Sequence, residues 1–399
     1  MSKLDELIKE LCPDGCVFIK IDDCFDKFNG MTGVSLKWKD EGNCKFIDYM
    51  NAYRNLKIDV TQTPFATVKN SNQNTLKHGD ILVTTASEVP DECALTSVIE
   101  NEIEDNIFLD DHLFGLHLKE AYKESIDTTF VNYYMNTINF KNDVRKKVKG
   151  VTRFFVAPND IGKIFIPFPH IEIQREIVRI LDNFTELTAE LTAELTDRKK
   201  QYEYYKNVLF NNAKGIELLT LDVIAENCDS QRKPVTSGNR ETGSIPYYGA
   251  SGIVDYVNDY IFDGDYLLIS EDGANLLART TPIAFSTSGK TWVNNHAHVL
   301  KFDEYATRRY VEMYLNSIDL TPYITGAAQP KLNQKNLNNI KIPLPPLPEQ
   351  QRLVDILDRF DTLCNNISTG LPAEIDERQK QYKYYRDKLL TFEKFAVEV

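Results

Sequence analysis

Residues 161–184 read IGKIFIPFPHIEIQREIVRILDNF, and residues 337–360 read LNNIKIPLPPLPEQQRLVDILDRF. The two stretches align without a gap. Pro167 matches Pro343, Gln174 matches Gln350, and both stretches end in Ile-Leu-Asp-x-Phe. The chain therefore contains a long internal repeat, and this repeat organises its fold.

A second matched block lies farther along each copy. Arg198-Lys-Lys-Gln-Tyr-Glu-Tyr-Tyr205 matches Arg378-Gln-Lys-Gln-Tyr-Lys-Tyr-Tyr385, and the second copy has gained four residues between its two blocks. Weaker similarities precede the blocks: residues 78–84 resemble residues 263–269, and residues 130–134 resemble residues 310–314. The two halves share an architecture while their variable stretches have diverged, which fits a recognition task in two parts.

Apolar residues at spacings of three and four follow each Pro-rich stretch and predict helices, the first from about 171 to 210. In the second copy Gly370 suits a helix C-cap and Pro372 the first turn of a new helix, so a break is expected there. The predicted apolar stripes are Ile173, Ile177, Ile180, Leu181, Phe184, Leu187, Leu191 and Leu195 in the first copy, and Leu353, Ile356, Leu357, Phe360, Leu363 and Ile367 in the second.

A forty-residue helix is about 60 Å long, and these helices have too little other apolar surface to stand alone, so we expect them to pack together. The globular segments alternate apolar and polar residues between Gly, Asn and Pro turns. We predict the α+β class, with two mixed α/β domains in an internal repeat separated by two long antiparallel helices that form a coiled-coil-like pair. The expected boundaries are 1–167 and 214–343 for the domains, and 168–213 and 344–399 for the helices.

Length and composition agree with a multidomain protein. A chain of 399 residues exceeds one typical core, and 42% hydrophobic and 26% charged residues are ordinary globular values. Seven scattered cysteines without a Cys-x-x-Cys pair favour reduced thiols. No apolar run approaches the eighteen or so residues that cross a bilayer, and the N-terminus lacks a signal-peptide pattern, so we expect a cytoplasmic protein without membrane contact.

The net charge of −13 argues at first against a nucleic-acid ligand, because phosphate contacts need Lys and Arg. The charge is unevenly distributed, however. Residues 141–153 hold six basic residues against Asp143, whereas residues 100–111 hold six acidic residues and no basic one. One basic face on an acidic protein is therefore possible.

The repeat resembles the specificity subunits of type I restriction-modification systems. The resemblance rests on Gln329-Pro-Lys-Leu-Asn333, on residues 340–350 (IKIPLPPLPEQ), on the Ile-Leu-Asp-x-Phe helix and on residues 381–390 (QYKYYRDKLL). Residues 7–15 (LIKELCPDG) and 247–252 (YYGASG) also look like that family. The first copy departs from the pattern, since residues 152–158 (TRFFVAP) replace the Gln-Pro-Lys-Leu-Asn stretch.

This resemblance implies a non-catalytic subunit with two target-recognition domains, each reading one half of a bipartite site in double-stranded DNA. The paired helices would set the spacing and dock two methyltransferase subunits, and restriction (motor-nuclease) subunits would join them. It implies a bacterial or archaeal host. It also implies no cofactor in this chain, with S-adenosylmethionine, ATP and magnesium bound by the partner subunits.

Amides, hydroxyls and basic side chains in the loops are candidates for base reading, and the basic cluster for phosphate contact. The repeat of Thr-Ala-Glu-Leu would act as spacer, and tyrosines near the helix ends would dock the partner. For DNA we nominate Thr84, Thr85, Ser87, Lys141, Arg145, Lys146, Lys149, Thr152 and Arg153 in the first half, and Tyr247, Tyr248, Ser251, Asp272, Asn275, Trp292, His296, Gln329, Lys331 and Asn333 in the second. The spacer residues are Thr188, Leu191, Thr192 and Leu195, and the partner-binding residues are Tyr202, Tyr205, Tyr382 and Tyr385.

Each nomination has a purely structural alternative. Tyr247 and Trp292 could be buried aromatics, the Ser and Thr hydroxyls could close turns, and the basic cluster could be a solvated helix face. The tyrosines could pack the two helices together or against the domains. The Thr-Ala-Glu-Leu repeat is in any case a good helix former with Leu on one face.

Motifs typical of enzymes are incomplete. Ser288-Gly-Lys-Thr291 resembles the end of a phosphate-binding loop, but Ala284 occupies the first Gly position. His296 and His298 have no third metal ligand within reach by sequence, so we expect neither a metal site nor a catalytic site. Two alternatives stay open: a helical protein-interaction scaffold without DNA specificity, and, less favoured, a self-contained nuclease or methyltransferase.

Overall fold

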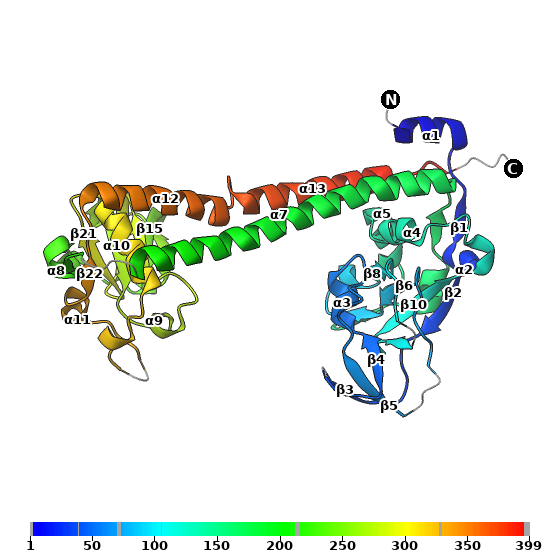
Figure 1. The fold of residues 1–399 in the computed structure, drawn as a ribbon, viewed down its shortest axis with the longest axis horizontal. Helices are drawn as coiled ribbons and strands as arrows, with labels where there is room; N and C mark the ends of the chain where they lie inside the picture. Colours follow the sequence, from blue (N-terminus) through cyan, green and yellow to red (C-terminus); the bar gives the residue numbers. More distant parts are fainter. Residues whose placement is uncertain are drawn as a thin grey trace. The chain divides into compact units, whose positions relative to one another are not determined.

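The computed structural model describes residues 3–38, 40–69, 73–104, 106–211, 216–326 and 329–394. The chain forms two compact units (Figure 1). Unit 1 comprises Met1–Glu190 and Ile375–Val399, and unit 2 comprises Leu191–Glu374. Each unit thus combines a globular part with segments of long helix from both repeats, which confirms the predicted α+β class with packed long helices.

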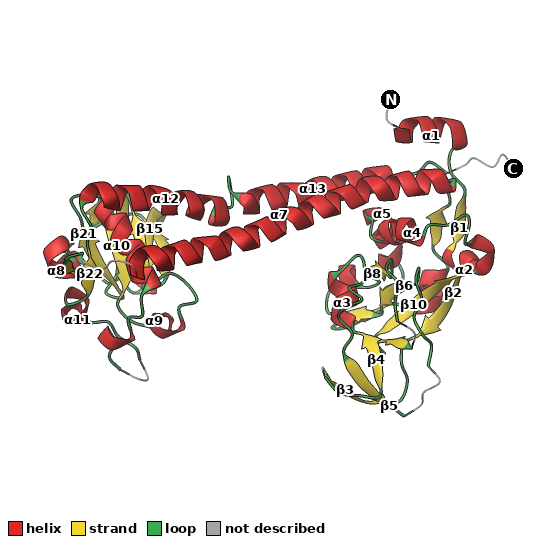
Figure 2. Ribbon diagram, in the orientation of Figure 1, coloured by secondary structure: helices red, strands yellow, loops and turns green. Residues whose placement is uncertain are grey.

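Unit 1 contains two four-stranded sheets, ordered β2-β10-β6-β8 and β3-β5-β4-β9, and two short pairs, β1-β12 and β7-β11 (Figure 2). Its main core lies between the first sheet, helices α4 and α5, and the start of α7. The elements are α1 (Lys3–Leu11), β1 (Phe18–Lys20), α2 (Ile21–Cys24), β2 (Phe25–Asn29), β3 (Val34–Trp38), β4 (Cys44–Ile47), α3 (Tyr49–Arg54), β5 (Phe65–Val68), β6 (Ile81–Thr84), β7 (Ala86–Ser87), β8 (Thr96–Val98), β9 (Ile107–Leu109), β10 (Leu113–Leu118), α4 (Thr128–Met135), α5 (Ile138–Arg145), β11 (Phe154–Phe155), α6 (Pro158–Gly162) and β12 (Phe165–Pro167).

Unit 2 repeats part of this plan. Its sheet β14-β21-β18-β19 corresponds to β2-β10-β6-β8, and its pair β13-β22 corresponds to β1-β12, while the sheet β16-β15-β20-β17 differs from that of unit 1. The elements are β13 (Leu218–Thr220), α8 (Leu221–Ile224), β14 (Glu226–Asn227), β15 (Thr242–Gly249), β16 (Gly252–Val257), β17 (Phe262–Asp263), β18 (Tyr266–Ser270), α9 (Asn275–Ala278), β19 (Ala284–Thr287), β20 (Lys290–Val293), β21 (Ala297–Lys301), α10 (Tyr305–Ser317), α11 (Gln334–Asn338), β22 (Lys341–Pro343) and α12 (Leu347–Asn365).

The matched glutamines fasten each domain to its helix. The side-chain amide of Gln174 donates to the carbonyl of Pro169 over 2.7 Å, and that of Gln350 donates to the carbonyl of Pro345 over 2.7 Å. Both glutamines are buried. Because a buried carbonyl needs a donor, this bond explains why Gln recurs at the same place in both repeats.

The long helices are α7 (Ile171–Asn211), as predicted, and α13 (Leu371–Leu389), which follows α12. Matched aromatic pairs join them. In unit 1 the ring of Phe184 stacks on Tyr385, with centroids 5.3 Å apart, and in unit 2 the corresponding Phe360 lies 5.9 Å from Tyr205. Each pair joins the Ile-Leu-Asp-x-Phe motif of one repeat to the tyrosine motif of the other. Within both units the helices therefore pack by the same contact.

The break in the second helix is confirmed, but Gly370 has a different role from the one predicted. Helix α12 ends with Asn366 as its C-cap, and the carbonyl of Gly370 accepts from Ala373 and Glu374, so Gly370 begins α13. Pro372 lies in the first turn of α13, as expected. Gly370 is needed because its α-carbon packs against the carbonyl groups that end α12.

The predicted stripe of α12 is also wrong at its end. Leu363 and Ile367 are exposed, whereas Val354 and Cys364 are fully buried. The chain leaves the helix at Asn365, so the helical spacing no longer applies to Ile367. Among the described residues, no helix is both long and apolar enough to cross a membrane.

We predict that Gly370→Ala destabilises unit 2 by about 1–3 kcal/mol, because an added methyl group in a packed site forces its neighbours to move. A Cβ there would lie 2.5 Å from the carbonyl oxygen of Thr362 and 2.8 Å from that of Leu363. Thermal unfolding of the full chain measures the effect. The matched control is Gly238→Ala, where a Cβ would meet nothing within 4 Å. Equal melting temperatures for the two variants would contradict the packing role.

Candidate nucleic-acid interface

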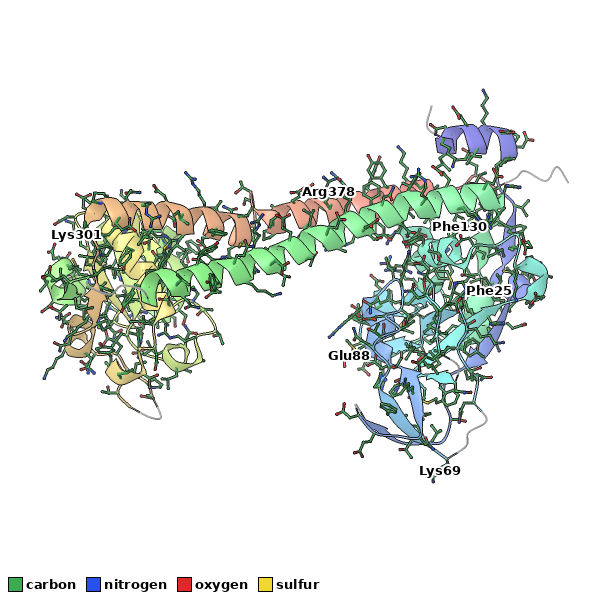
Figure 3. The ribbon with its side chains drawn as sticks, viewed as in Figure 1. Phe25, Lys69, Glu88, Phe130, Lys301 and Arg378 are labelled. Carbon is green, nitrogen blue, oxygen red and sulfur yellow. The ribbon has the colours of Figure 1, made fainter. Side chains whose placement is uncertain are left out.

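A cleft of about 860 Å³ in unit 1 gathers four of the nominated residues. Thr85 and Ser87 come from the segment after β6, and Thr152 and Arg153 from the segment before β11. The pairing of β7 with β11 brings these two segments together. Glu88, labelled in Figure 3, lies beside them on the wall of the cleft.

Hydrogen bonds orient the polar groups of this cleft. The hydroxyl of Thr85 donates to the carbonyl of His112 over 2.7 Å, and that of Ser87 donates to the Glu92 carboxylate over 2.9 Å. Thr84 is fully buried instead, where its hydroxyl accepts from the backbone N–H of Leu95. Thr84 therefore supports the loop from inside and does not line the cleft.

Sequence reasoning missed the aromatic wall of the cleft. Tyr49 and Tyr53 of α3 stack with ring centroids 5.8 Å apart, and both line the cleft together with Met50. Burial raises the pKa of Tyr49, whose hydroxyl donates to the carbonyl of Ala86. Their spacing of four residues on a helix capped by Asp48 was the available signal. Tyrosines at such a position suit a binding surface.

The nominated basic cluster is largely paired with acids. Arg145 binds Asp91 through two hydrogen bonds of 2.5 Å, Lys146 lies 2.7 Å from Asp143, and Lys149 lies 3.6 Å from Asp160. Burial and the nearby Arg386 lower the pKa of Lys141. Two further lysines, Lys163 and Lys394, were not nominated: together with Lys146 and Lys147 of the basic cluster they line a cavity of about 320 Å³ in unit 1, around Phe18 and Phe165.

In unit 2 the nominated aromatic side chains are hydrogen-bonded to backbone or stacked on another ring. Tyr247 is 1% exposed, and its hydroxyl accepts from the backbone N–H of Val235. Tyr248 stacks on Phe285, and the indole N–H of Trp292 donates to the carbonyl of Lys233. Ser251 is exposed in the turn between β15 and β16.

The structure does bring Asp272, His296 and Lys331 together. The ring of His296 lies 2.8 Å from the Asp272 carboxylate, and Asp272 forms a backbone bridge with Lys331. Gln329 is exposed in the same loop as Lys331. Asn275 and Asn333 instead cap local backbone, since their side-chain oxygens accept from the N–H groups of Thr281 and Asn336.

The spacer and tyrosine nominations lie on the long helices. Leu191 and Leu195 are half-buried, Thr192 is exposed, and the hydroxyl of Thr188 donates to the carbonyl of Phe184. Tyr202 and Tyr382 pack against the globular parts of units 2 and 1 respectively. Tyr205 and Tyr385 are partly exposed beside the matched phenylalanines. Their neighbours Tyr204 and Tyr384, which were not nominated, are the most exposed tyrosines of the two motifs.

Asp110, Asp111 and His112 place possible metal-ligand atoms within 4.8 Å of one another. The imidazole of His112 lies 3.0 Å from both carboxylates, and Asp110 also accepts the backbone N–H of His112. These bonds close the turn between β9 and β10, which is a sufficient structural reason for the cluster.

Comparisons with known proteins agree with one another. The family model described as type I restriction modification DNA specificity domain matches residues 13–198 and 214–377. The EcoR124I/EcoR124II specificity subunit of Escherichia coli is 36% identical over 296 residues, covering 66% of this chain and 71% of that protein. A putative type I specificity subunit of Haemophilus influenzae is 39% identical over 182 residues, covering 45% of this chain and 47% of that protein.

The fold is also that of a known structure. The type I restriction-modification S subunit from M. genitalium superposes with a TM-score of 0.54 at 16% identity, covering 94% of this chain and 96% of that one. At this identity the likeness supports the fold alone. Because the family model matches both repeats over most of their length, this chain belongs to the family of DNA specificity subunits of type I restriction-modification systems.

Proposed function

We propose that the two units each read one half of a bipartite site in double-stranded DNA. In this proposal residues 1–167 and 214–343 are the two target-recognition domains. Residues 168–213 and 344–399 set the distance between the half-sites and dock two methyltransferase subunits. Restriction subunits would join this complex. The complex would act in the cytoplasm of a bacterial or archaeal cell.

Specificity subunits of this family are not catalytic and carry no cofactor, and catalysis belongs to the methyltransferase and restriction subunits. S-adenosylmethionine, ATP and magnesium would therefore bind the partners. The isolated chain should transfer no methyl group when it is incubated with labelled S-adenosylmethionine and DNA. Transfer by the isolated chain would overturn the proposal.

The cleft of unit 1 is the observation that carries the proposal. Its lining presents hydroxyl groups, the guanidinium of Arg153 and the carboxylates of Glu88 and Glu92 on one surface. In the major groove, guanidinium groups bind the acceptor edge of guanine, and carboxylates accept from the amino group of cytosine. The stacked tyrosines offer a rigid amphipathic surface beside them. Such a set can distinguish base pairs.

We predict that Arg153→Ala relaxes one half of the recognised site by about tenfold at one position, because losing a good base contact costs about 1–3 kcal/mol. The measurement is methylation mapping of DNA from cells that contain the variant with its methyltransferase. The other half-site should not change. The matched control is Arg54→Ala, which removes an exposed arginine of the same unit from helix α3 outside the cleft. Unchanged specificity for Arg153→Ala would remove the cleft from the reading surface.

The scaffold alternative predicts no dependence on DNA sequence. Mixed with a methyltransferase subunit, this chain should shift its target DNA at low salt and release it as salt rises, since phosphate contacts displace counterions. A shift of the same size with unrelated DNA would favour the scaffold.

A further inference from the structure

Unit 2 contains a buried group of charged side chains beneath the loop that carries Lys331. The group comprises Asp229 before β15, Arg232, Glu271 after β18, and His298 of β21. His298 is fully buried, and Asp229 and Glu271 are at most 9% exposed. Buried charges of this kind contribute little net stability compared with apolar packing, so another role should account for them.

The imidazole of His298 has acceptors on both sides. Its Nδ1 lies 2.6 Å from a carboxylate oxygen of Asp229, and its Nε2 lies 2.7 Å from the carbonyl oxygen of Leu332. A carbonyl oxygen can only accept, so Nε2 donates to Leu332, while Nδ1 faces the carboxylate of Asp229.

The same group contacts the side chain of Lys331 and also the backbone of the residue that follows it. The ammonium of Lys331 lies 3.1 Å from one carboxylate oxygen of Glu271, and Arg232 donates to the other oxygen over 2.6 Å. The backbone N–H of the following residue, Leu332, donates to the carbonyl of Glu271 over 2.7 Å. An ammonium has three donors, and Glu271 takes up one contact. The side chain of Lys331 is half exposed.

The neighbouring groups lower the pKa values of both carboxylates. Burial alone would raise the pKa of Asp229, but His298, the backbone N–H of Val299 and Arg232 together lower it. The pKa of Glu271 is lowered in the same way, against its burial, by Arg232, His298 and Lys331. The group is thus a set of mutually compensating charges, and each member depends on the others.

Unit 1 has no such group at the corresponding place. His112 corresponds to His296, so Phe114 of β10 occupies the place of His298. In the first sheet Asp26 pairs with His117, and at the equivalent position of the second sheet Glu226 pairs with Lys301. Asn29 and Asp229 each lie three residues after these matched acids, so Asn29 occupies the place of Asp229. Asn29 and Phe114 are opposite one another in the ladder. One repeat therefore has an exposed amide and a buried apolar ring where the other has two buried ionisable side chains.

We propose that His298 is a positioning residue for DNA reading by unit 2: it fixes the Leu332 carbonyl and, with Glu271, holds Lys331 toward the acceptor edge of a guanine. This proposal rests on the proposed function, since it assumes that unit 2 reads a half-site. Lys is a common donor to the two acceptor atoms of guanine in the major groove. The charged group restricts where that donor can be.

Two variants test the proposal in the complex with the methyltransferase. Asp229→Asn with His298→Phe gives unit 2 the residues of unit 1 and leaves neither charge of the pair behind. Lys331→Ala removes the reading group itself. We expect both to relax the same position of one half-site by about tenfold, while the half-site read by unit 1 stays unchanged. Methylation mapping measures both half-sites in one experiment, so unit 1 is an internal control.

The outcomes separate the two claims. If Lys331→Ala relaxes a position that the double variant leaves intact, the positioning role is wrong and DNA reading by unit 2 stands. If neither variant changes a half-site, the proposal for this loop is wrong, and Arg153→Ala in unit 1 still tests the proposed function independently.

A second measurement does not need the double variant. In the full-length wild-type chain labelled with ¹⁵N-histidine, the buried Nε2–H of His298 that donates to the Leu332 carbonyl should exchange slowly with solvent. That signal should be absent from His298→Phe. Fast exchange of every histidine ring N–H would overturn the proposal.

Discussion

Inserting one Thr-Ala-Glu-Leu unit after Leu195 is expected to widen the gap between the recognised half-sites by about one to two base pairs and to leave both half-sites unchanged. Four helical residues add about 6 Å, against 3.4 Å for each base-pair step. Helix α7 runs without interruption from residues of unit 1 into residues of unit 2, so an insertion lengthens this connection. Four residues are also close to one helical turn, which returns the leucines to nearly the same face.

Methylation mapping of the insertion variant gives the new gap directly. The matched control is Thr192→Ala, which changes an exposed side chain of the same segment without changing the length of the helix. It should leave the gap as it is. An insertion variant that methylates with an unchanged gap would contradict the role of α7 as a spacer.

Arg309→Ala should destabilise unit 2 by about 3 kcal/mol or more, because removing one partner of a mostly buried ion network leaves uncompensated charges. Arg309 of α10 lies 2.7 Å from Asp358 and 3.0 Å from Asp361 of α12, and 2.5 Å from Glu312. Glu312 is buried, and burial raises its pKa while Arg309 opposes that effect. Without Arg309, three carboxylates would face one another between the domain and its helix.

Urea unfolding, followed together with amide hydrogen exchange in α10, measures this loss. The matched control is Arg352→Ala, whose ion pair with Glu349 is exposed on both sides and lies within α12. Exposed pairs contribute little to stability, so the control should unfold close to the wild type. Equal losses from the two variants would show that the network does not join α10 to α12.

The repeat and the long helices could be predicted because their signals are local. Helical spacing identified α7 to within a residue of its end, and Pro372 identified the start of α13. Local sequence signals did not predict the role of Gly370. It depends on the carbonyl groups of the preceding helix, and those are brought close only by the loop that joins the two helices.

The candidate site was predictable only in part. Thr85, Ser87, Thr152 and Arg153 do share one cleft, but the stacked tyrosines of α3 lie far from them in sequence and carry no motif. Tyr247 is buried and Arg145 is paired with Asp91, and neither fact follows from residue type alone. Charge pairing over long sequence distances depends on which segments the fold brings together, and the sequence pattern does not determine this.

Bipartite DNA reading by the two units can be measured by methylation mapping of DNA from cells that hold this chain and a type I methyltransferase subunit. We expect methylated sites that share a bipartite sequence with a fixed gap, with Arg153→Ala altering one half and Lys331→Ala altering the other. A single continuous recognition sequence, or one half-site changed by both variants, would contradict this expectation.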